Sequence, residues 1–304
     1  IRMGPGNFLA RAYQQIPIAI TVEGANIMTR TLIIFGQGAI RCHPYVLALM
    51  RSAEGGDSGA FDRALFGYFG FLLRNAARAL AFATPLRLVI ARLHGAAREL
   101  ARYYRAATRL STALALASDV SMATLGGTLK RRETITGRLG DVLSQLFILS
   151  AVLKRYEDEG RPTADLPFVH WAAQDALARA DTALRDTIDN HPNGAARFVL
   201  RLLIRPFGGR IAPPDDRADA AVAALVQTQG PARERLFAGC WTPRMAVDPI
   251  AATHVAFALY PAVTAIEQRL RPDIRTGSVA RLPQNYRELD AWAADAERAG
   301  LISA

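Results

Sequence analysis

Apolar residues between positions 139 and 153 recur at steps of three and four, a spacing that places them on one face of an α-helix. The pattern stops at Glu157–Gly160, and Pro162 follows, as expected where a helix ends. The same period runs through almost all of the chain after residue 60, whereas two-residue alternation bounded by turn pairs is hard to find. The sequence therefore predicts an all-α helical bundle. The apolar positions of this first stripe are Leu139, Val142, Leu143, Leu146, Leu149 and Leu153.

Two further helix starts can be located from capping residues. Asp165 with Pro167 predicts a helix that runs to about Asn190, and Asp248 directly before proline predicts another. The second of these helices contains Pro249–Ile266, the longest run free of charged side chains, which a histidine and a proline interrupt. A membrane span needs ~20 strongly apolar residues. We therefore interpret this run as a buried helix.

Two stretches rich in glycine, proline and aspartate predict breaks between helical sets. The first is Ser52–Ser58, SAEGGDS, and the second is Pro206–Asp216, PFGGRIAPPDD. We interpret residues 1–55 as the end of one domain and residues 56–304 as a second, with a further boundary at 206–216.

The chain carries 37 Lys and Arg against 27 Asp and Glu, a net charge of +10, which suits anionic partners such as nucleic acid, an anionic membrane or the phosphates of coenzyme A. The basic residues are spread along helices and are not interleaved with aromatic ones, so nucleic acid is not favoured. Cys42 and Cys240 lie far apart and the histidines are scattered, which predicts no metal site and a reducing, cytoplasmic setting. The chain starts without methionine or a leader, and we expect a piece of a longer protein.

One carboxylate, Glu23, lies alone in the uncharged stretch ITVEGANIM (20–28). Apolar neighbours should raise its pKa, because desolvation disfavours the charged form. A base of this kind can take a proton from carbon in a pocket that holds little water. Gly24 behind it would let a ligand approach closely. The alternative is a structural carboxylate that caps the following helix.

Three segments carry a resemblance to a known family. Glu23-Gly24, with Arg30 seven residues after the glutamate, lies in YQQIPIAITVEGANIMTRTLIIFGQGAIRCHPYVL (13–47). This segment resembles bacterial FadE-type acyl-CoA dehydrogenases, which carry an extended C-terminal helical domain. LGGTLKRRETITGRLGDVLSQLFILSAVLKRYEDEG (125–160) and DLPFVHWAAQDAL (165–177) are similar to the same enzymes. The resemblance identifies 1–55 as the end of the catalytic helical domain and 56–304 as the C-terminal α-helical domain.

The resemblance implies a FAD-dependent enzyme of fatty-acid β-oxidation that converts medium- or long-chain acyl-CoA to trans-2-enoyl-CoA. It assigns Glu23 as the catalytic base and Gly24, Ala25 and Asn26 to the backbone beside the flavin, with Arg30 as a substrate- or cofactor-binding residue. Ala25 stands where threonine or serine is common, so a side-chain contact to flavin is lost there. The resemblance also implies electron-transferring flavoprotein as the oxidant, a homodimer, and an isolated chain that is inactive because the flavin-binding parts lie upstream.

The stretch ARFVLRLLIRPFGGR (196–210) has arginines every four residues, with apolar side chains over much of the remaining surface. This pattern is typical of a helix at a membrane surface, and an ordinary core helix with a basic face would look similar. The first reading predicts a peripheral contact at the inner membrane. The contact residues would be Arg197, Phe198, Arg201, Leu202 and Arg205.

Two alternatives stay open. The aromatic-rich stretch 61–93 could be core, a subunit contact or part of an acyl tunnel. The whole chain could also be a non-catalytic helical module that binds a membrane or a partner protein and keeps the family's sequence without its flavin half.

Overall fold

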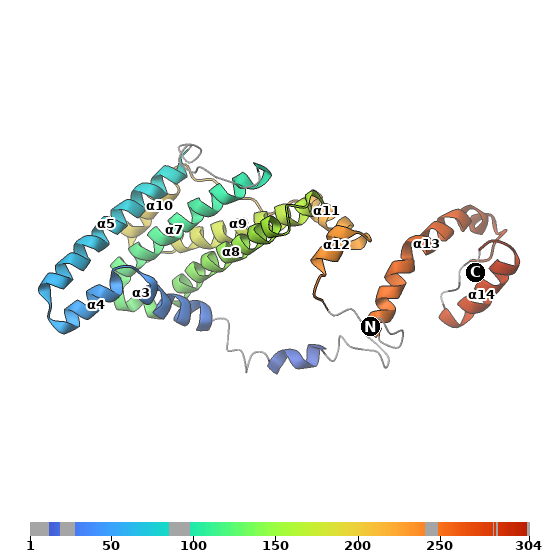
Figure 1. Ribbon diagram of the computed structural model, residues 1–304, viewed down its shortest axis with the longest axis horizontal. Coiled ribbons are helices and arrows are strands. Elements are labelled where there is room, and N and C mark those ends of the chain that lie inside the picture. Colours follow the sequence, from blue (N-terminus) through green and yellow to red (C-terminus); the bar gives the residue numbers. More distant parts are fainter. Residues whose placement is uncertain are drawn as a thin grey trace. The chain divides into compact units, whose positions relative to one another are not determined.

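The computed structural model describes residues 12–18, 28–84, 98–240, 249–281, 283 and 285–302. Within these ranges every regular element is a helix, which confirms the all-α prediction (Figure 1). The chain divides into two compact units, Pro17–Leu236 and a smaller one formed by Ile1–Ile16 with Phe237–Ala304. The predicted boundary after residue 55 stays a prediction.

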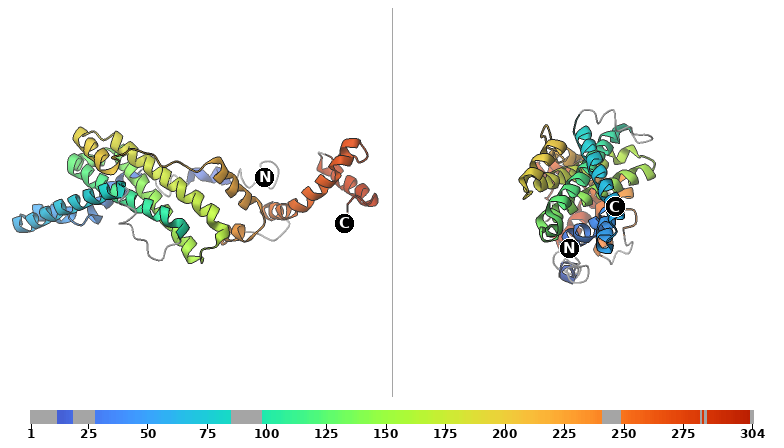
Figure 2. Two further views of the ribbon diagram at one scale, coloured as in Figure 1. Left: turned by 90° about the horizontal axis from the view of Figure 1, so that it is seen from above. Right: turned by 90° about the vertical axis from the view of Figure 1, so that its left-hand side faces the viewer.

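Four long helices build the core of the larger unit, and they run lengthwise beside one another (Figures 1 and 2). α8 packs along α9, while α7 contacts α5, α8 and α9. Side chains of the predicted stripe on α8, such as Leu139 and Leu149, are fully buried, whereas Leu143 lies outside the core. The helices are α5 (Ser58–Ala83), α7 (Ala101–Leu125), α8 (Glu133–Asp158) and α9 (Leu166–Asp189).

Helix ends fall where the sequence places them. α8 ends at Asp158, and Gly160 follows with φ of 81°, a left-handed conformation that glycine adopts without strain. α9 begins at Leu166 with proline in its first turn and ends one residue before the predicted Asn190. These two boundaries lie where the sequence predicted them, but Asp165 makes no capping hydrogen bond to α9, because its carboxylate pairs with Arg235 instead.

Shorter helices complete the larger unit. α4 continues through Gly55, so the first predicted break consists only of Gly56 and Asp57. The side chain of Asp57 caps α5, because it accepts a hydrogen bond from the backbone N–H of Ala60 at 2.9 Å. The second predicted break matches the non-helical residues between Ile204 and Asp216. These elements are η1 (Thr29–Gly38), α3 (Ala39–Cys42), α4 (Val46–Gly55), η2 (Arg98–Leu100), η3 (Gly126–Arg131), η4 (Thr163–Asp165), α10 (Gly194–Ile204), α11 (Asp216–Gln227) and α12 (Pro231–Leu236).

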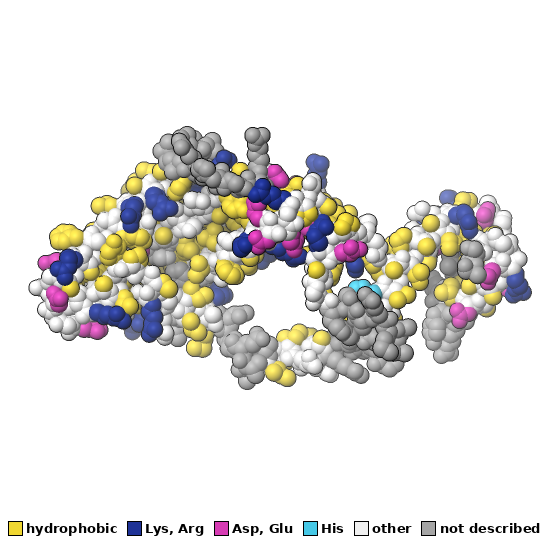
Figure 3. Space-filling view, viewed as in Figure 1, with side chains coloured by type: hydrophobic (Ala, Val, Ile, Leu, Met, Phe, Trp, Pro, Cys, Tyr) yellow, Lys and Arg dark blue, Asp and Glu magenta, His cyan; other side chains and the backbone are white. Residues whose placement is uncertain are grey.

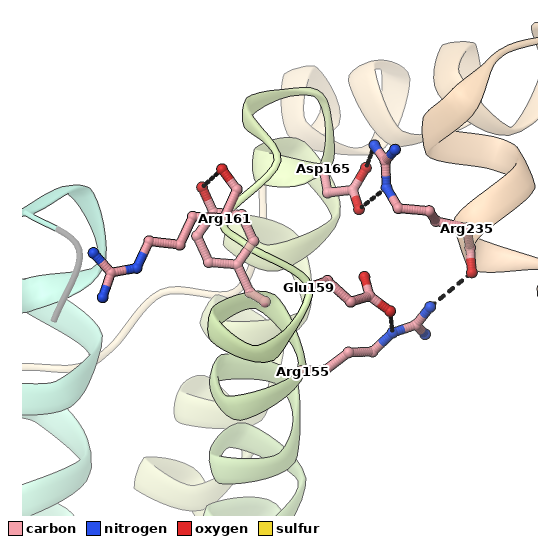
Figure 4. A network of polar contacts seen from close by, with 6 residues as sticks. Arg155, Glu159, Arg161, Asp165 and Arg235 are labelled. Atoms are coloured by element: carbon pink, nitrogen blue, oxygen red, sulfur yellow. Dashed lines mark hydrogen bonds and ion pairs between the residues drawn. The ribbon is translucent and has the colours of Figure 1, made fainter.

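A polar network attaches α12 to the start of α9 (Figure 4). Arg235 donates from Nε and Nη2 to the two carboxylate oxygens of Asp165, at 2.9 and 2.6 Å. Arg155 on α8 donates to the carbonyl oxygen of Arg235 at 2.7 Å and pairs with Glu159. Charged side chains therefore make the polar attachment of α12.

The smaller unit contains α13 (Pro249–Thr276) and α14 (Tyr286–Arg298). The prediction that Pro249–Ile266 is a buried helix is wrong, because side chains such as Leu259 and Tyr260 are mostly exposed. The apolar run made the helix, but most of its large side chains, such as Val255, Leu259 and Tyr260, are exposed. Among the described helices, α8 and the Ile250–Thr276 part of α13 are long and apolar enough to span a membrane, with 44% and 6% of their apolar windows buried. Length and composition alone are weak evidence for a span.

Candidate functional site

The helix that follows the predicted base has an unusual winding. η1 is a π-helix, and the N–H of Ala39 after it donates to the carbonyl oxygen of Ile34, five residues back. π-helices are rare, and single π-turns within α-helices are frequent at functional sites. η1 packs against α8, and its end continues into α3.

Arg30 near the start of η1 forms an ion pair with Asp141 on α8. Its Nε lies 2.7 Å from Oδ1 of Asp141, and its Nη2 donates to Oδ2 at 2.8 Å. Only the Nη2 contact has hydrogen-bond geometry, since Nε lies within ion-pair distance but has no hydrogen-bond partner. The side chains are 41% and 39% exposed, so solvent screens the pair and its main contribution is orientation.

Two glycines of α8 face η1, and one of them, Gly140, lets the backbone of η1 come unusually close. A Cβ placed on Gly140 would lie 2.9 Å from the carbonyl oxygen of Arg30 and 3.5 Å from its Cα. A Cβ on Gly137, one turn earlier on the same face, would lie 3.2 Å from Nη2 of Arg30 and 3.4 Å from Cγ2 of Thr31. The backbone contact therefore depends on the absence of a side chain at Gly140, whereas at Gly137 only side-chain atoms would have to give way.

A second anchor holds the end of this segment to α7. Nδ1 of His43 accepts from the backbone N–H groups of Tyr45 and Val46, each at 3.1 Å, so in the neutral ring the proton is on Nε2. Nε2 lies 3.2 Å from Oδ1 of Asp119, whose Oδ2 accepts from Asn75 at 3.1 Å. Both side chains of the His43–Asp119 pair are almost completely buried.

Burial sets the protonation of this anchor. It lowers the pKa of His43, although Asp119 acts in the opposite direction, and it raises the pKa of Asp119. Burial and the nearby Asp119 also raise the pKa of Tyr68 to about 12, and its hydroxyl donates to the Asp119 carbonyl oxygen at 3.2 Å. The rings of Tyr68 and Phe71 pack on the imidazole at centroid distances of 5.2 and 5.1 Å. His43 is thus a packed, neutral structural group.

An open groove of about 840 Å³ lies beside the contact between η1 and α8. Arg30 and Asp141 form one wall, and α9 contributes the ion pair of Arg179 and Asp175 at 2.8 Å. Its charges are therefore largely balanced within the protein. Among the described residues, no group of three or more His, Cys, Asp and Glu side chains could hold a metal ion.

Comparison with protein families shows to which family the chain belongs. Residues 40–304 match the family described as acyl-CoA dehydrogenase, C-terminal, bacterial type. The chain belongs to this family. No solved structure matches it. The resemblance found in the sequence is confirmed, and the acyl-CoA dehydrogenases, an oxidoreductase family, use FAD.

The predicted site residues of this acyl-CoA dehydrogenase domain have different outcomes. Glu23, Gly24, Ala25 and Asn26 lie outside the described residues, so the structure contains no flavin-facing geometry for them. Arg30 is described, and its guanidinium is paired with Asp141 at the edge of the groove. Its predicted role in substrate or cofactor binding stays a prediction.

The predicted membrane-contact residues lie together on and just after α10, which packs on α5, α7 and α9. Phe198 and Leu202 are 67% and 53% exposed, while Leu200 and Ile204 on the opposite face are buried. Arg201 donates twice to Oδ1 of Asp189, at 3.0 and 2.8 Å. The remaining two arginines contact backbone carbonyl oxygens, Arg197 that of Asp189 at 3.5 Å and Arg205 that of Gly209.

Sequence reasoning missed the residues that hold the base-bearing segment in place. Gly137 and Gly140 interrupt a strong helical pattern three residues apart, and such glycines usually have a packing reason. That signal was readable. Asp119 and Asp141 gave none, because their partners are far away in the sequence.

Proposed function

We propose that this chain is the C-terminal part of a FAD-dependent acyl-CoA dehydrogenase that forms trans-2-enoyl-CoA from medium- or long-chain acyl-CoA in fatty-acid β-oxidation. The family match over residues 40–304 supports it. The observation that carries the proposal is the docking of Arg30 on Gly140 and Asp141. That contact connects the family's C-terminal domain to a residue only seven positions after the predicted base.

The chain's own contribution to this reaction is a base and its position. Glu23 would remove the proton from the carbon next to the thioester carbonyl, and its backbone N–H would donate to the carbonyl oxygen, where negative charge develops. The chemistry that FAD would supply in this reaction is a hydride acceptor for the β-carbon. Apolar neighbours would keep the pKa of the carboxyl high enough for proton removal.

Docking matters because general-base catalysis depends on distance. A base must reach its proton within a hydrogen-bond length, and a misplacement of about 1 Å can cost roughly 100-fold in rate. A helix fixed by backbone contact at Gly140 would hold the preceding segment in one register. The C-terminal domain would then be a positioning element of the catalytic site.

The test uses the full-length protein that contains this chain. Glu23→Gln should lower the rate of palmitoyl-CoA oxidation by at least about 100-fold while the absorption spectrum of the bound flavin is retained. Glu54→Gln, which removes an exposed carboxylate on α4, is the matched control and should keep full activity. Activity of Glu23→Gln close to that of the control would contradict the assignment.

A peripheral membrane contact is a second proposal, favoured by the exposed apolar face of α10. Phe198 and Leu202 point away from the bundle, and arginines lie beside them, which suits a surface with anionic headgroups. Figure 3 shows hydrophobic and basic side chains interspersed over the larger unit. Phe198→Ser with Leu202→Ser should reduce co-sedimentation with anionic vesicles, and Leu80→Ser on α5 is the control. Equal co-sedimentation of all three proteins would contradict it.

The acyl-CoA dehydrogenase proposal also includes a cytoplasmic homodimer that passes its electrons to electron-transferring flavoprotein. Light scattering of the full-length protein measures the first property. Reduction of electron-transferring flavoprotein by the acyl-CoA-reduced enzyme measures the second.

A further inference from the structure

The face of α8 that receives η1 continues along the helix as an exposed apolar stripe. Leu143 follows Gly140 by three residues, and the next two positions on this face are Phe147 and Ala151, at steps of four. Phe147 is 75% exposed, and Leu143 and Ile148 beside it are 42% and 46% exposed. Ala151 is exposed as well. These four residues, Leu143, Phe147, Ile148 and Ala151, are called the α8 stripe below.

The direction of η1 relates this stripe to the preceding part of the protein. Gly140 faces the backbone of Arg30, whereas Gly137, three residues earlier on α8, faces the side chain of Thr31. η1 also contacts η3, which precedes α8 in the chain. η1 therefore runs antiparallel to α8. Followed from its end to its start, η1 points along α8 towards the α8 stripe.

The charged side chains next to the stripe are paired with one another. Nζ of Lys154 lies 2.7 Å from Oδ2 of Asp158, and Nε of Arg155 lies 2.8 Å from Oε1 of Glu159. These four side chains carry no net charge, whereas a surface for an anionic membrane has an excess of cations beside its apolar residues. An apolar centre with a balanced polar rim is typical of a contact between protein surfaces.

The size of the stripe favours a contact within one polypeptide. Complete burial of an aromatic side chain covers roughly 150–250 Å². The stripe has one such side chain, two aliphatic ones that are less than half exposed, and an alanine. This area is far below the ~800 Å² that each partner buries in a stable complex of separate proteins. A covalently linked segment needs less area, because the link raises its effective concentration.

We propose that the α8 stripe is the docking surface for an apolar segment of the flavin-binding part of the enzyme, upstream of this chain. The inference rests on the proposed function, in which this chain is the C-terminal part of a longer acyl-CoA dehydrogenase. The docked segment continues the contact that η1 begins at Gly140. α8 then carries η1 and the upstream part on one rigid helix, which couples the position of the predicted base to that of the flavin-binding part.

The experiment measures access of a reagent to the stripe in the full-length protein. Phe147→Cys should react with a maleimide at least about tenfold more slowly than Phe66→Cys, because a docked segment admits the reagent only while it is detached. Phe66 on α5 is the matched control, since the two phenylalanines are 75% and 73% exposed in this structure. Cys42 and Cys240 are exposed too, so mass spectrometry of the peptide with the introduced cysteine measures each rate.

A charge placed on the stripe should detach the docked segment. In an Ala151→Cys background, Phe147→Asp should raise the labelling rate of the cysteine by at least about tenfold, because burial of an unpaired carboxylate against an apolar segment is strongly unfavourable. Phe66→Asp in the same background should leave the rate unchanged. Neither measurement needs turnover, so this docking can fail while Glu23→Gln behaves as proposed, and the reverse.

The other outcomes overturn the proposal. Equal labelling of Phe147→Cys and Phe66→Cys would show that nothing covers the stripe. Protection that is lost on dilution would make a second copy of the protein the occupant, and protection that appears only with anionic vesicles would make it a membrane. An Ala151→Cys rate that Phe147→Asp leaves unchanged would show that the docked segment does not depend on this stripe.

Discussion

Two ends of the same helical bundle are attached by different chemistry. η1 lies on α8 with backbone against glycine, and the ion pair of Arg30 and Asp141 flanks that contact. α12 is attached by side chains that extend from their helices, above all Arg235 to the buried Asp165 (Figure 4). The first contact ties two backbones together directly, whereas the second leaves several rotatable bonds between them.

The difference teaches which attachment can position a reactive group. A Cβ on Gly140 would lie closer to the backbone of Arg30 than van der Waals contact allows. The two backbones are therefore in direct contact with little room to move, so η1 has one register on α8. An arginine side chain can follow small movements of its partner, so α12 can shift and keep its ion pair. The rigid attachment is the one next to the predicted base.

The largest effect should follow from filling the glycine contact. Gly140→Ala gains helix propensity of ~1 kcal/mol but places a methyl group against the Arg30 carbonyl, which should cost more and leave a net loss of about 1–2 kcal/mol. In the full-length enzyme kcat should fall by roughly tenfold or more while KM changes little, because the base moves and the binding surface does not. Urea unfolding and steady-state kinetics with palmitoyl-CoA measure the two effects.

Gly70→Ala is the control for this substitution. Gly70 is helical and exposed on α5, and a Cβ there would meet nothing within 4 Å. This variant should gain up to about 1 kcal/mol and keep its activity. If Gly140→Ala behaved in the same way, η1 would not be fixed by backbone contact.

Arg235→Ala should act locally. It leaves the carboxylate of Asp165 without its main partner and removes the charged attachment of α12. Amide hydrogen exchange in residues 231–236 should become faster, while α8 and α9 keep their protection and the enzyme keeps its kcat. A fall in kcat similar to that of Gly140→Ala would remove the distinction between the two attachments.

The pH dependence of stability should report the second anchor of the η1 segment. The pKa of His43 is lowered from 6.5 in the folded protein, so the unfolded chain takes up a proton first as the pH falls. The contribution of neutral His43 to the free energy of unfolding is complete above pH 6.5, and it is lost as the pH falls from 6.5 through the lowered pKa of the folded protein. The free energy of unfolding should therefore decrease between pH 7.5 and 5.5, and less steeply in His43→Gln.

Other titrating groups should keep the free energy of unfolding of His43→Gln from becoming independent of pH. The pKa values of His170 and His191 are also lowered by burial, and they should leave a residual slope in His43→Gln. The pKa of Asp119, which faces His43, is raised above 3.8, so at more acid pH this carboxyl acts in the opposite direction. Identical slopes of His43→Gln and wild type would show that this anchor does not couple to pH.

The smallest effect on stability should come from the ion pair of Arg30 and Asp141. Both side chains are partly exposed, so a double-mutant cycle with Arg30→Gln and Asp141→Asn should give a coupling energy of at most about 1 kcal/mol. Asp141→Glu should keep a higher kcat than Asp141→Asn, because it retains the carboxylate. A coupling energy of several kcal/mol would mean that charge, and not backbone contact, holds η1.

The sequence predicted where the helices of the bundle lie along the chain better than it predicted which helix faces are buried. The stripe from Leu139 to Leu153 and the boundary at Asp165 were readable, because periodicity and a proline in the first turn are local signals. The burial of Pro249–Ile266 was predicted wrongly, since an apolar run specifies a helix but not a covering partner. The candidate site was predicted from a resemblance, and its central residues lie outside the described ranges.

The amino-acid sequence by itself determined that the chain is helical, where α8 and α9 end, and to which family it belongs, because each of these is written in residues close together along the chain. Only the tertiary structure decided that Gly140 meets the backbone of Arg30 and that His43 meets Asp119. Those pairings join residues that can be more than a hundred positions apart, and packing alone brings them together.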